Sequence, residues 1–202
     1  YLHTDARRWM GENLPAMIEH IEKAEKIKLN AVYAPQYQYV MGMITMPDLS
    51  FVYSACNVVM NASKGEGFGI PIIEAQACGC PVIVTDFSAM PELCYVGQVA
   101  AWSDTMWTPQ ESYQVVPDVD DLAECLWREY ELRSDTKRRE KAREAMVANY
   151  DVRVVWDKYW IPALERMEGK PVISDVLQSN PTPIIKEEKT SPVIEEKAVE
   201  NV

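Results

Sequence analysis

Histidine and cysteine are scarce in this 202-residue chain, which has two histidines and five cysteines. His3 and His20 are distant in sequence, and Cys78-Gly79-Cys80 lacks the two-residue gap of a redox or zinc pair. These absences argue against a zinc site, and no bound metal is expected. The odd number of cysteines and the lack of an opening signal peptide indicate reduced thiols and a cytoplasmic protein.

Long hydrophobic runs and an excess of basic residues are also missing. No apolar stretch approaches the roughly 20 residues of a membrane-spanning helix, so no transmembrane segment is expected. The net charge is −11, which argues against a nucleic-acid backbone as partner. With 48% hydrophobic and 25% charged residues, the composition is that of a soluble globular protein with a real core.

Glycine is infrequent, but four of the eight glycines lie between positions 65 and 79. Gly65, Gly67 and Gly69 alternate with bulkier residues, which predicts a loop with positive φ angles that a ligand can approach closely. Pro71 suits the first position of a helix, and an apolar helix is expected over residues 72–78.

The start of this helix has no side-chain cap, because no Ser, Thr, Asn or Asp lies at positions 67–71. The N–H groups of Ile72, Ile73 and Glu74 are therefore expected to be free. Water is one acceptor for them. An anion is another, and the helix dipole favours it.

Two glutamates flank the loop and the helix start. Glu66 lies in the loop, and the side chain of Glu74 leans back toward the same end of the helix. A carboxylate repels phosphate but pairs well with a vicinal diol. We therefore expect Glu74 to bind ribose hydroxyls, Glu66 to bind a second sugar, and the loop amides to bind phosphates between them. Spacing alone leaves an alternative open, in which Glu74 only favours the helix start and Glu66 is solvated.

The run from Asn61 to Glu92, NASKGEGFGIPIIEAQACGCPVIVTDFSAMPE, resembles the donor-binding signature of retaining GT-B glycosyltransferases, specifically the glycosyl transferases group 1 family (family four). It contains the Glu, seven residues, Glu element and then a helix that ends in a Gly-x-Pro-Val strand entry. The resemblance implies that Glu66 binds the donor sugar, as the candidate catalytic residue that orients it, and that Glu74 binds the ribose. The implied diphosphate contacts are the backbone of Gly67, Phe68 and Gly69, and Ile70 completes the donor-binding residues.

Alternating strands and helices are expected along the chain. Expected strands cover 1–3, 27–33, 58–61, 81–85 and 99–102, and expected helices cover 13–26, 48–55, 72–78, 118–132, 134–149 (with Ser134 as its cap) and 152–167. Residues 102–113 are expected to form a loop. The pattern predicts an α/β fold with a Rossmann-like parallel sheet flanked by helices. The resemblance implies the C-terminal half of a GT-B fold, truncated at its N-terminus.

Residues 1–168 are expected to form one nucleotide-sugar-binding domain without its first strand. Residues 169–202, rich in Pro, Glu and Lys, are expected to be a disordered tail. The comparison with the family leads us to expect that the Arg- and Lys-bearing loop that grips donor phosphates is missing, and the amino-terminal acceptor domain with it. A truncated sheet is expected to expose an edge and an apolar surface.

The sequence therefore predicts the donor-binding part of an incomplete glycosyltransferase. It would transfer a sugar from a UDP- or GDP-linked donor to an unknown acceptor, with retention and without a cofactor. The alternatives are an inactive nucleotide-sugar-binding module and a nucleotide-sugar epimerase of the same fold. His3 and Thr4 are either donor contacts or plain loop residues. Ser88 and Ala89 stand where the family often has two glycines, which weakens the case for close backbone approach.

Overall fold

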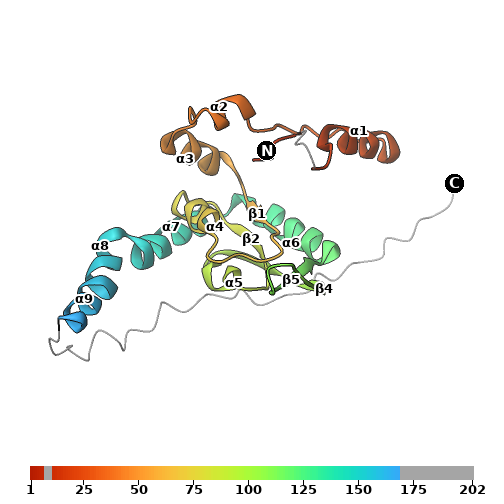
Figure 1. Ribbon diagram of the computed structural model, residues 1–202. Helices are drawn as coiled ribbons and strands as arrows, with labels where there is room; N and C mark the ends of the chain where they lie inside the picture. The colour runs from red at the N-terminus through yellow and green to blue at the C-terminus, as the bar shows by residue number, and fades with distance from the viewer. Residues whose placement is uncertain (7–10, 169–202) are drawn as a thin grey trace. The chain divides into compact units, whose positions relative to one another are not determined.

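The computed structural model describes residues 1–6 and 11–168. The chain divides into two compact units, Tyr1–Leu49 and Ser50–Val202 (Figure 1). The tail expected at 169–202 lies outside the described residues. No described helix is both long and apolar enough to cross a membrane.

The first unit is mostly helical. Its longest helix, α1 (Leu14–Glu25), begins as the periodicity predicts, because the Asn13 Oδ1 accepts the Ala16 N–H at 3.3 Å. The short helix α2 (Gln36–Val40) follows. The third helix, α3 (Met46–Ala55), carries the chain from the first unit into the second.

The strands expected at 1–3 and 27–33 are reduced to a single parallel bridge between Leu2 and Tyr33. The prediction of a full strand over 27–33 is therefore wrong. Its apolar side chains, including Ile27, Leu29 and Val32, are 40–59% exposed. A strand gains its stability from a neighbouring strand and a packed face, and apolar residues alone do not supply them.

The second unit is built around a three-stranded parallel sheet. Its strands are β1 (Val59–Asn61), β2 (Val82–Thr85) and β3 (Gly97–Ala100), in the order β1-β2-β3. All four residues of the central strand β2 are fully buried. Gly97 opens β3 with φ 144°, and a Cβ there would lie 1.8 Å from the Val82 carbonyl oxygen, so only glycine fits this close approach.

Helices cover both faces of the sheet, as a parallel sheet requires. Helices α4 (Ile70–Ala77) and α5 (Met90–Leu93) pack on one face, in a cluster that includes Ile72, Val82 and Val84. The other face packs against α6 (Val119–Glu131), where Cys125 contacts Ile83. The expected α/β fold with a Rossmann-like sheet flanked by helices is confirmed.

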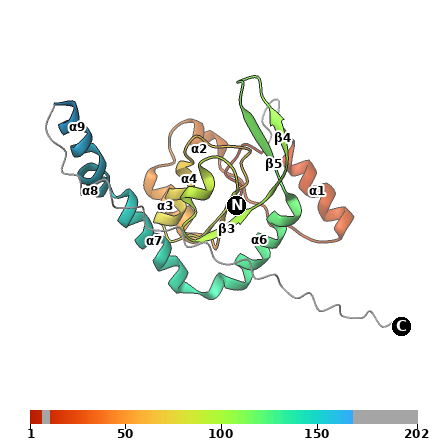
Figure 2. The same ribbon diagram turned by 90° about the horizontal axis from the view of Figure 1, so that it is seen from below.

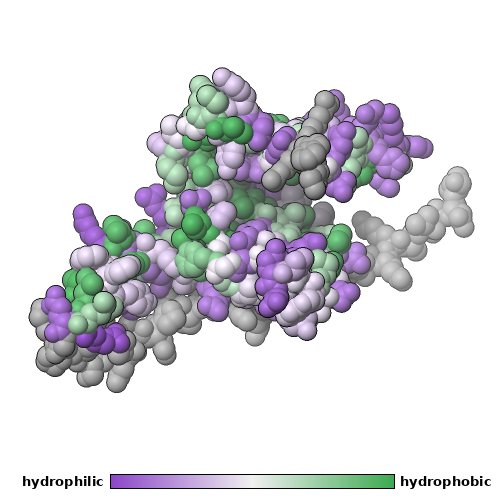
Figure 3. Space-filling view, viewed as in Figure 1, coloured by the Kyte–Doolittle hydropathy of each residue, from purple (hydrophilic) through white to green (hydrophobic). Residues whose placement is uncertain are grey.

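The helices after the sheet begin at aspartates. Asp118 caps α6 as predicted, by accepting the N–H groups of Asp120 and Asp121. The cap of α7 (Thr136–Tyr150) is Asp135, and the prediction of Ser134 is wrong because Ser134 ends the 3-10 turn Leu132–Ser134. The last predicted helix consists of α8 (Val152–Val155), a π-helical turn (Trp156–Trp160) and α9 (Ile161–Met167). Hydrophobic side chains stay exposed along this segment (Figure 3).

An antiparallel hairpin replaces the loop expected at residues 102–113. It consists of β4 (Trp102–Trp107) and β5 (Tyr113–Pro117), and its tip projects from the rest of the second unit (Figure 2). The rings of Trp107 and Tyr113 meet edge to face across the hairpin, with their centroids 4.9 Å apart. All six residues of β4 are exposed, so the strand has no apolar alternation from which it could be predicted.

Candidate functional site

The glycine-rich loop runs from the carboxyl end of β1 to the start of α4, the edge of a parallel sheet where ligands bind. Of its three glycines only Gly69 has a positive φ, of 96°. A Cβ on Gly69 would lie 2.8 Å from the Ile72 Cδ1. The expectation of positive φ is therefore wrong for Gly65 and Gly67. At these two positions the missing side chain leaves space next to the loop, and the backbone does not adopt the left-handed conformation.

The unpaired backbone donors lie earlier in the chain than predicted. Gly69 is the N-cap of α4 and makes no side-chain capping bond, as expected. The Ile72 N–H, however, donates to the Gly69 carbonyl at 3.0 Å, because the first turn is tightened. Within residues 1–6 and 11–168, the N–H groups of Gly67, Phe68 and Gly69 donate no hydrogen bond. These three loop amides, beside a helix N-terminus, can accept an anion.

The backbone of Glu66 is held by a second loop. Its N–H donates to the Ser88 Oγ at 2.9 Å, and Ser88 lies between β2 and α5. Ser88 has φ 55°, in the left-handed region. The residue that replaces a family glycine thus keeps a glycine-like backbone and adds a hydrogen bond. Sequence reasoning treated Ser88 only as a departure from the family pattern.

Glu74 is held by a side chain from outside the signature. The Tyr53 hydroxyl, on α3, donates to the Glu74 Oε2 at 3.1 Å. Burial and the neighbouring Glu74 carboxylate raise the pKa of the Tyr53 phenol well above its ordinary value, so Tyr53 stays protonated and keeps donating. Glu74 also borders a hollow of about 290 Å³ between α4 and α7.

Gln76 anchors the helix that carries these groups, and no sequence signal marked it. Its side chain is fully buried. The Nε2 donates to the carbonyls of Ile72 and Leu93, at 3.0 and 2.7 Å, and the Oε1 accepts the N–H groups of Tyr95 and Val96, at 2.9 and 3.0 Å. All four hydrogen-bonding positions of the amide are used. Helix α4 is therefore fixed, through its last turn, to the segment that leads into β3.

A buried hydroxyl lies at the end of the neighbouring strand. Thr85 closes β2, is fully buried, and its Oγ1 has no hydrogen-bond partner within the described residues. An unpaired buried hydroxyl costs about 1–3 kcal/mol. Although Thr85 lies at the carboxyl end of β2, its full burial keeps this hydroxyl away from a ligand at the edge of the sheet.

The first unit has a polar hollow of its own, of about 360 Å³, lined by residues that include His3, Thr4, Gln36 and Tyr39. The His3 Nδ1 lies 3.0 Å from the Tyr1 hydroxyl, and the rings of His3 and Tyr39 meet edge to face at 5.2 Å. The structure thus brings His3 and Tyr39 together at this hollow.

Metal chemistry has no candidate centre in the part of the chain that the structure describes, where no three His, Cys, Asp or Glu side chains are grouped to hold an ion. None of the five cysteines, all of which lie in the described part, forms a disulfide. Burial raises the pKa of the Cys80 thiol to about 12, and the pKa of the Cys78 thiol is also raised by burial. Such thiols are protonated at neutral pH and are poor nucleophiles.

Known proteins resemble part of this chain. The protein is 32% identical over 89 residues to O-antigen chain mannosyltransferase B of Escherichia coli, which covers 44% of this chain and 22% of that protein. It is 29% identical over 83 residues to the lipopolysaccharide core biosynthesis mannosyltransferase LpcC of Rhizobium leguminosarum bv. viciae, over 41% of this chain and 24% of that protein. It is 34% identical over 61 residues to a D-inositol 3-phosphate glycosyltransferase of Pseudarthrobacter chlorophenolicus, and this alignment covers 30% of this chain and 14% of that protein.

Each of these alignments spans less than a quarter of the relative's own length. The family model described as Glycosyl transferases group 1 matches residues 11–128, which include the glycine-rich loop, both glutamates and the whole parallel sheet. Because this match covers more than half of the 202 residues, the chain belongs to the glycosyl transferases group 1 family.

Proposed function

We propose that this chain binds a nucleotide diphosphate sugar, as the donor-binding part of a retaining glycosyltransferase with the GT-B fold. The observation that carries the proposal is the set of three unpaired amides at Gly67, Phe68 and Gly69, which lies at the start of α4 between Glu66 and Glu74. The amides and the helix dipole would bind the diphosphate, whose negative charge they complement.

The two glutamates would bind the hydroxyl groups on either side of the diphosphate. Glu74 would accept hydrogen bonds from the ribose diol, and its Oε2 is already oriented by the Tyr53 hydroxyl. Glu66 would accept from the sugar hydroxyls, and the Ser88 Oγ fixes its backbone. Neither glutamate needs to act as a nucleophile, because orientation of the sugar and stabilisation of the leaving diphosphate are the functions assigned to this site.

Mannose is the first sugar to test, because two of the relatives described above are mannosyltransferases by name. GDP-mannose and UDP-glucose, which differ in both base and sugar, are therefore tested in parallel as representatives of the two donor types. We further propose that the sugar bound at this donor site is transferred to an acceptor with retention. A module that binds the nucleotide sugar without turnover is the alternative function.

Isothermal titration with GDP-mannose and UDP-glucose tests the proposal. We expect binding of one donor, and a loss of affinity of about tenfold in Glu74→Gln, since hydrogen bonds to charged groups contribute about 1.5–3 kcal/mol. Glu144→Gln is the matched control, because Glu144 is an exposed glutamate on α7.

Absence of binding by both donors would overturn the proposal, and so would equal affinities of the Glu74→Gln and Glu144→Gln proteins. Binding followed by no sugar release or transfer would favour the binding module. An anomeric product analysis by NMR then tests retention.

A further inference from the structure

The hairpin of β4 and β5 begins at the same edge of the parallel sheet as the proposed donor site. The glycine-rich loop follows the carboxyl end of β1, and β4 begins at Trp102, two residues after the end of β3. Because β1, β2 and β3 are parallel, their carboxyl ends lie at one edge of the sheet, where ligands bind. The hairpin therefore starts beside the candidate site, and its tip projects from the unit (Figure 2).

Two hydrogen bonds hold the hairpin to the loops of the candidate site. At its base the Trp102 Nε1 donates to the Asp86 carbonyl at 3.1 Å. Asp86 opens the loop between β2 and α5, and this loop also holds the backbone of Glu66. In the middle of the hairpin the Val115 N–H donates to the Lys64 carbonyl at 2.9 Å. The hairpin is thus fixed to both loops that position Glu66.

Near its tip the hairpin carries two aromatic side chains, Trp107 and Tyr113, which we call the aromatic platform. They are cross-strand partners and are 62% and 61% exposed. Tyr113 lies two residues before Val115 on β5. Lys64, whose carbonyl Val115 contacts, lies two residues before Glu66. Two residues span at most about 7 Å, so the Cα atoms of Tyr113 and Glu66 lie no more than about 22 Å apart.

The turn that carries the platform is held in one conformation. The Thr108 N–H and Oγ1 both donate to the Ser112 carbonyl at 3.0 Å, and the Thr108 carbonyl accepts the Glu111 N–H at 3.0 Å. Trp107 and Tyr113 meet edge to face, which leaves ring faces open to a ligand. A platform that is ordered before binding loses little conformational entropy when a ligand arrives.

The size and chemistry of the platform fit a sugar ring better than a protein surface. Two aromatic side chains present at most about 500 Å², whereas a standard protein interface takes about 800 Å² from each partner. Residues 103–105 of β4 are polar, so the apolar patch does not continue along the strand. A pyranose has an apolar C–H face that packs on an aromatic ring, and hydroxyls around its rim. The turn offers these hydroxyls an amide, a carboxylate and a hydroxyl, from Gln110, Glu111 and Ser112.

We propose that the aromatic platform binds a pyranose ring of the acceptor, and that the acceptor is an oligosaccharide. This inference rests on the proposed function, because it takes the donor sugar to lie at Glu66. A separation of at most about 22 Å is one that a short oligosaccharide spans. One acceptor chain can therefore pack a ring on Trp107 and Tyr113 and present its end to the donor sugar.

NMR titration of the full chain with mannotetraose and with maltotetraose, without any donor, tests the platform by itself. We expect the indole N–H signal of Trp107 and the backbone amide signal of Tyr113 to shift saturably with at least one of these sugars. In Trp107→Ala the affinity, followed at Tyr113, is expected to fall at least about fivefold, because the ring contact is lost. Trp107→Phe keeps a ring and is expected to lose less.

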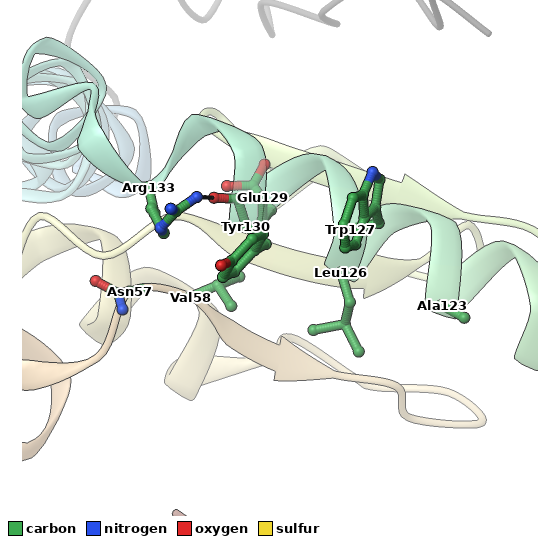
Figure 4. A pocket seen from close by; sticks show the side chains of 8 residues that line it. All are labelled: Asn57, Val58, Ala123, Leu126, Trp127, Glu129, Tyr130 and Arg133. Carbon is green, nitrogen blue, oxygen red and sulfur yellow. Dashed lines mark hydrogen bonds between the residues drawn. The ribbon is translucent and has the colours of Figure 1, made fainter. Parts of the chain in front are cut away.

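Trp127→Ala is the matched control. Trp127 lies on α6, is 57% exposed, and stacks on Tyr130 at 5.6 Å beside a hollow of about 520 Å³ (Figure 4). It belongs to an aromatic pair of similar exposure that is part of neither the hairpin nor the loops of the candidate site. We expect this variant to bind the oligosaccharide as the wild-type chain does.

Absence of a shift at Trp107 with both sugars would overturn the proposal, and so would equal affinities of Trp107→Ala and the wild-type chain. Equal losses in Trp107→Ala and Trp127→Ala would overturn it as well, because the sugar would then bind exposed aromatic rings in general. A Trp107 signal that shifts with protein concentration and not with sugar would place a second copy of the chain on the platform.

The platform and the donor site can fail separately. Titration of the wild-type chain with GDP-mannose and UDP-glucose tests only the donor site. Donor binding without any oligosaccharide at Trp107 would refute the platform and leave the proposed function intact. Oligosaccharide binding at Trp107 without any donor binding would refute the proposed function, and with it the assignment of the bound oligosaccharide as an acceptor.

Discussion

Leucine has nearly the same side-chain volume as glutamine but forms no hydrogen bonds. We therefore expect the replacement of Gln76 by leucine to lower the stability of the second unit strongly. The substitution removes every hydrogen bond of a fully buried amide. It leaves the N–H groups of Tyr95 and Val96 and the Leu93 carbonyl without this partner, and Tyr95 and Val96 are both 6% exposed. Each buried polar group left unpaired costs about 1–3 kcal/mol, so three such groups cost at least about 3 kcal/mol.

Urea denaturation followed by tryptophan fluorescence measures this loss, because five of the six tryptophans lie beyond residue 49. Gln110→Leu is the matched control: Gln110 is exposed in the turn of the hairpin, where a change within about 0.5 kcal/mol is expected. A loss below about 1 kcal/mol for Gln76→Leu would refute the reasoning, since buried hydrogen bonds of this number should contribute more. Gln76→Glu separates shape from chemistry, because a carboxylate keeps the acceptor but cannot donate to Leu93.

Two further predictions concern the site and its surroundings. Tyr53→Phe removes only the hydroxyl that orients Glu74. Because one hydrogen bond contributes about 0.5–1.5 kcal/mol, we expect the affinity for the nucleotide sugar, measured by titration, to fall about 2- to 10-fold. If Glu74→Gln lowers the affinity and Tyr53→Phe does not, Tyr53 has no positioning role. Burial raises the pKa of the Cys80 thiol from 9.0 to about 12. As the pH rises, the unfolded chain therefore loses this proton before the folded chain does, and the free energy of unfolding should fall between pH 9 and 12. Cys80→Ala should show a shallower decline in urea denaturation across that range, and identical slopes would contradict the assignment.

The parallel sheet could be predicted because its strands are buried and apolar. The run from Val82 to Val84 has no polar side chain, and a strand buried on both faces needs none. The end of β3 and the hairpin could not be predicted in the same way. Trp102 to Trp107 are exposed throughout β4, and the hairpin depends on pairing with β5 rather than on burial of one face.

The candidate site was predictable where it depends on local chain geometry. The spacing of Glu66 and Glu74 and the missing helix cap are visible in the sequence, and the structure retains the missing cap. The groups that hold these residues come from distant positions. Tyr53 precedes Glu74 by 21 residues and Ser88 follows Glu66 by 22, so no helical or strand periodicity connects either pair.

The signature thus provides the groups that we propose face the donor, and the surrounding fold provides their orientation. Tyr53 reaches Glu74 from α3, Ser88 reaches Glu66 from the loop after β2, and Gln76 fixes α4 to the segment before β3. Three separate segments therefore hold one loop–helix unit. Loss of the Tyr53 or the Ser88 contact removes one hydrogen bond to a proposed donor-binding glutamate, whereas loss of the Gln76 side chain removes four. Stability and donor affinity should accordingly separate: Gln76 variants should lower stability first, whereas Tyr53 variants should lower affinity with little loss of stability.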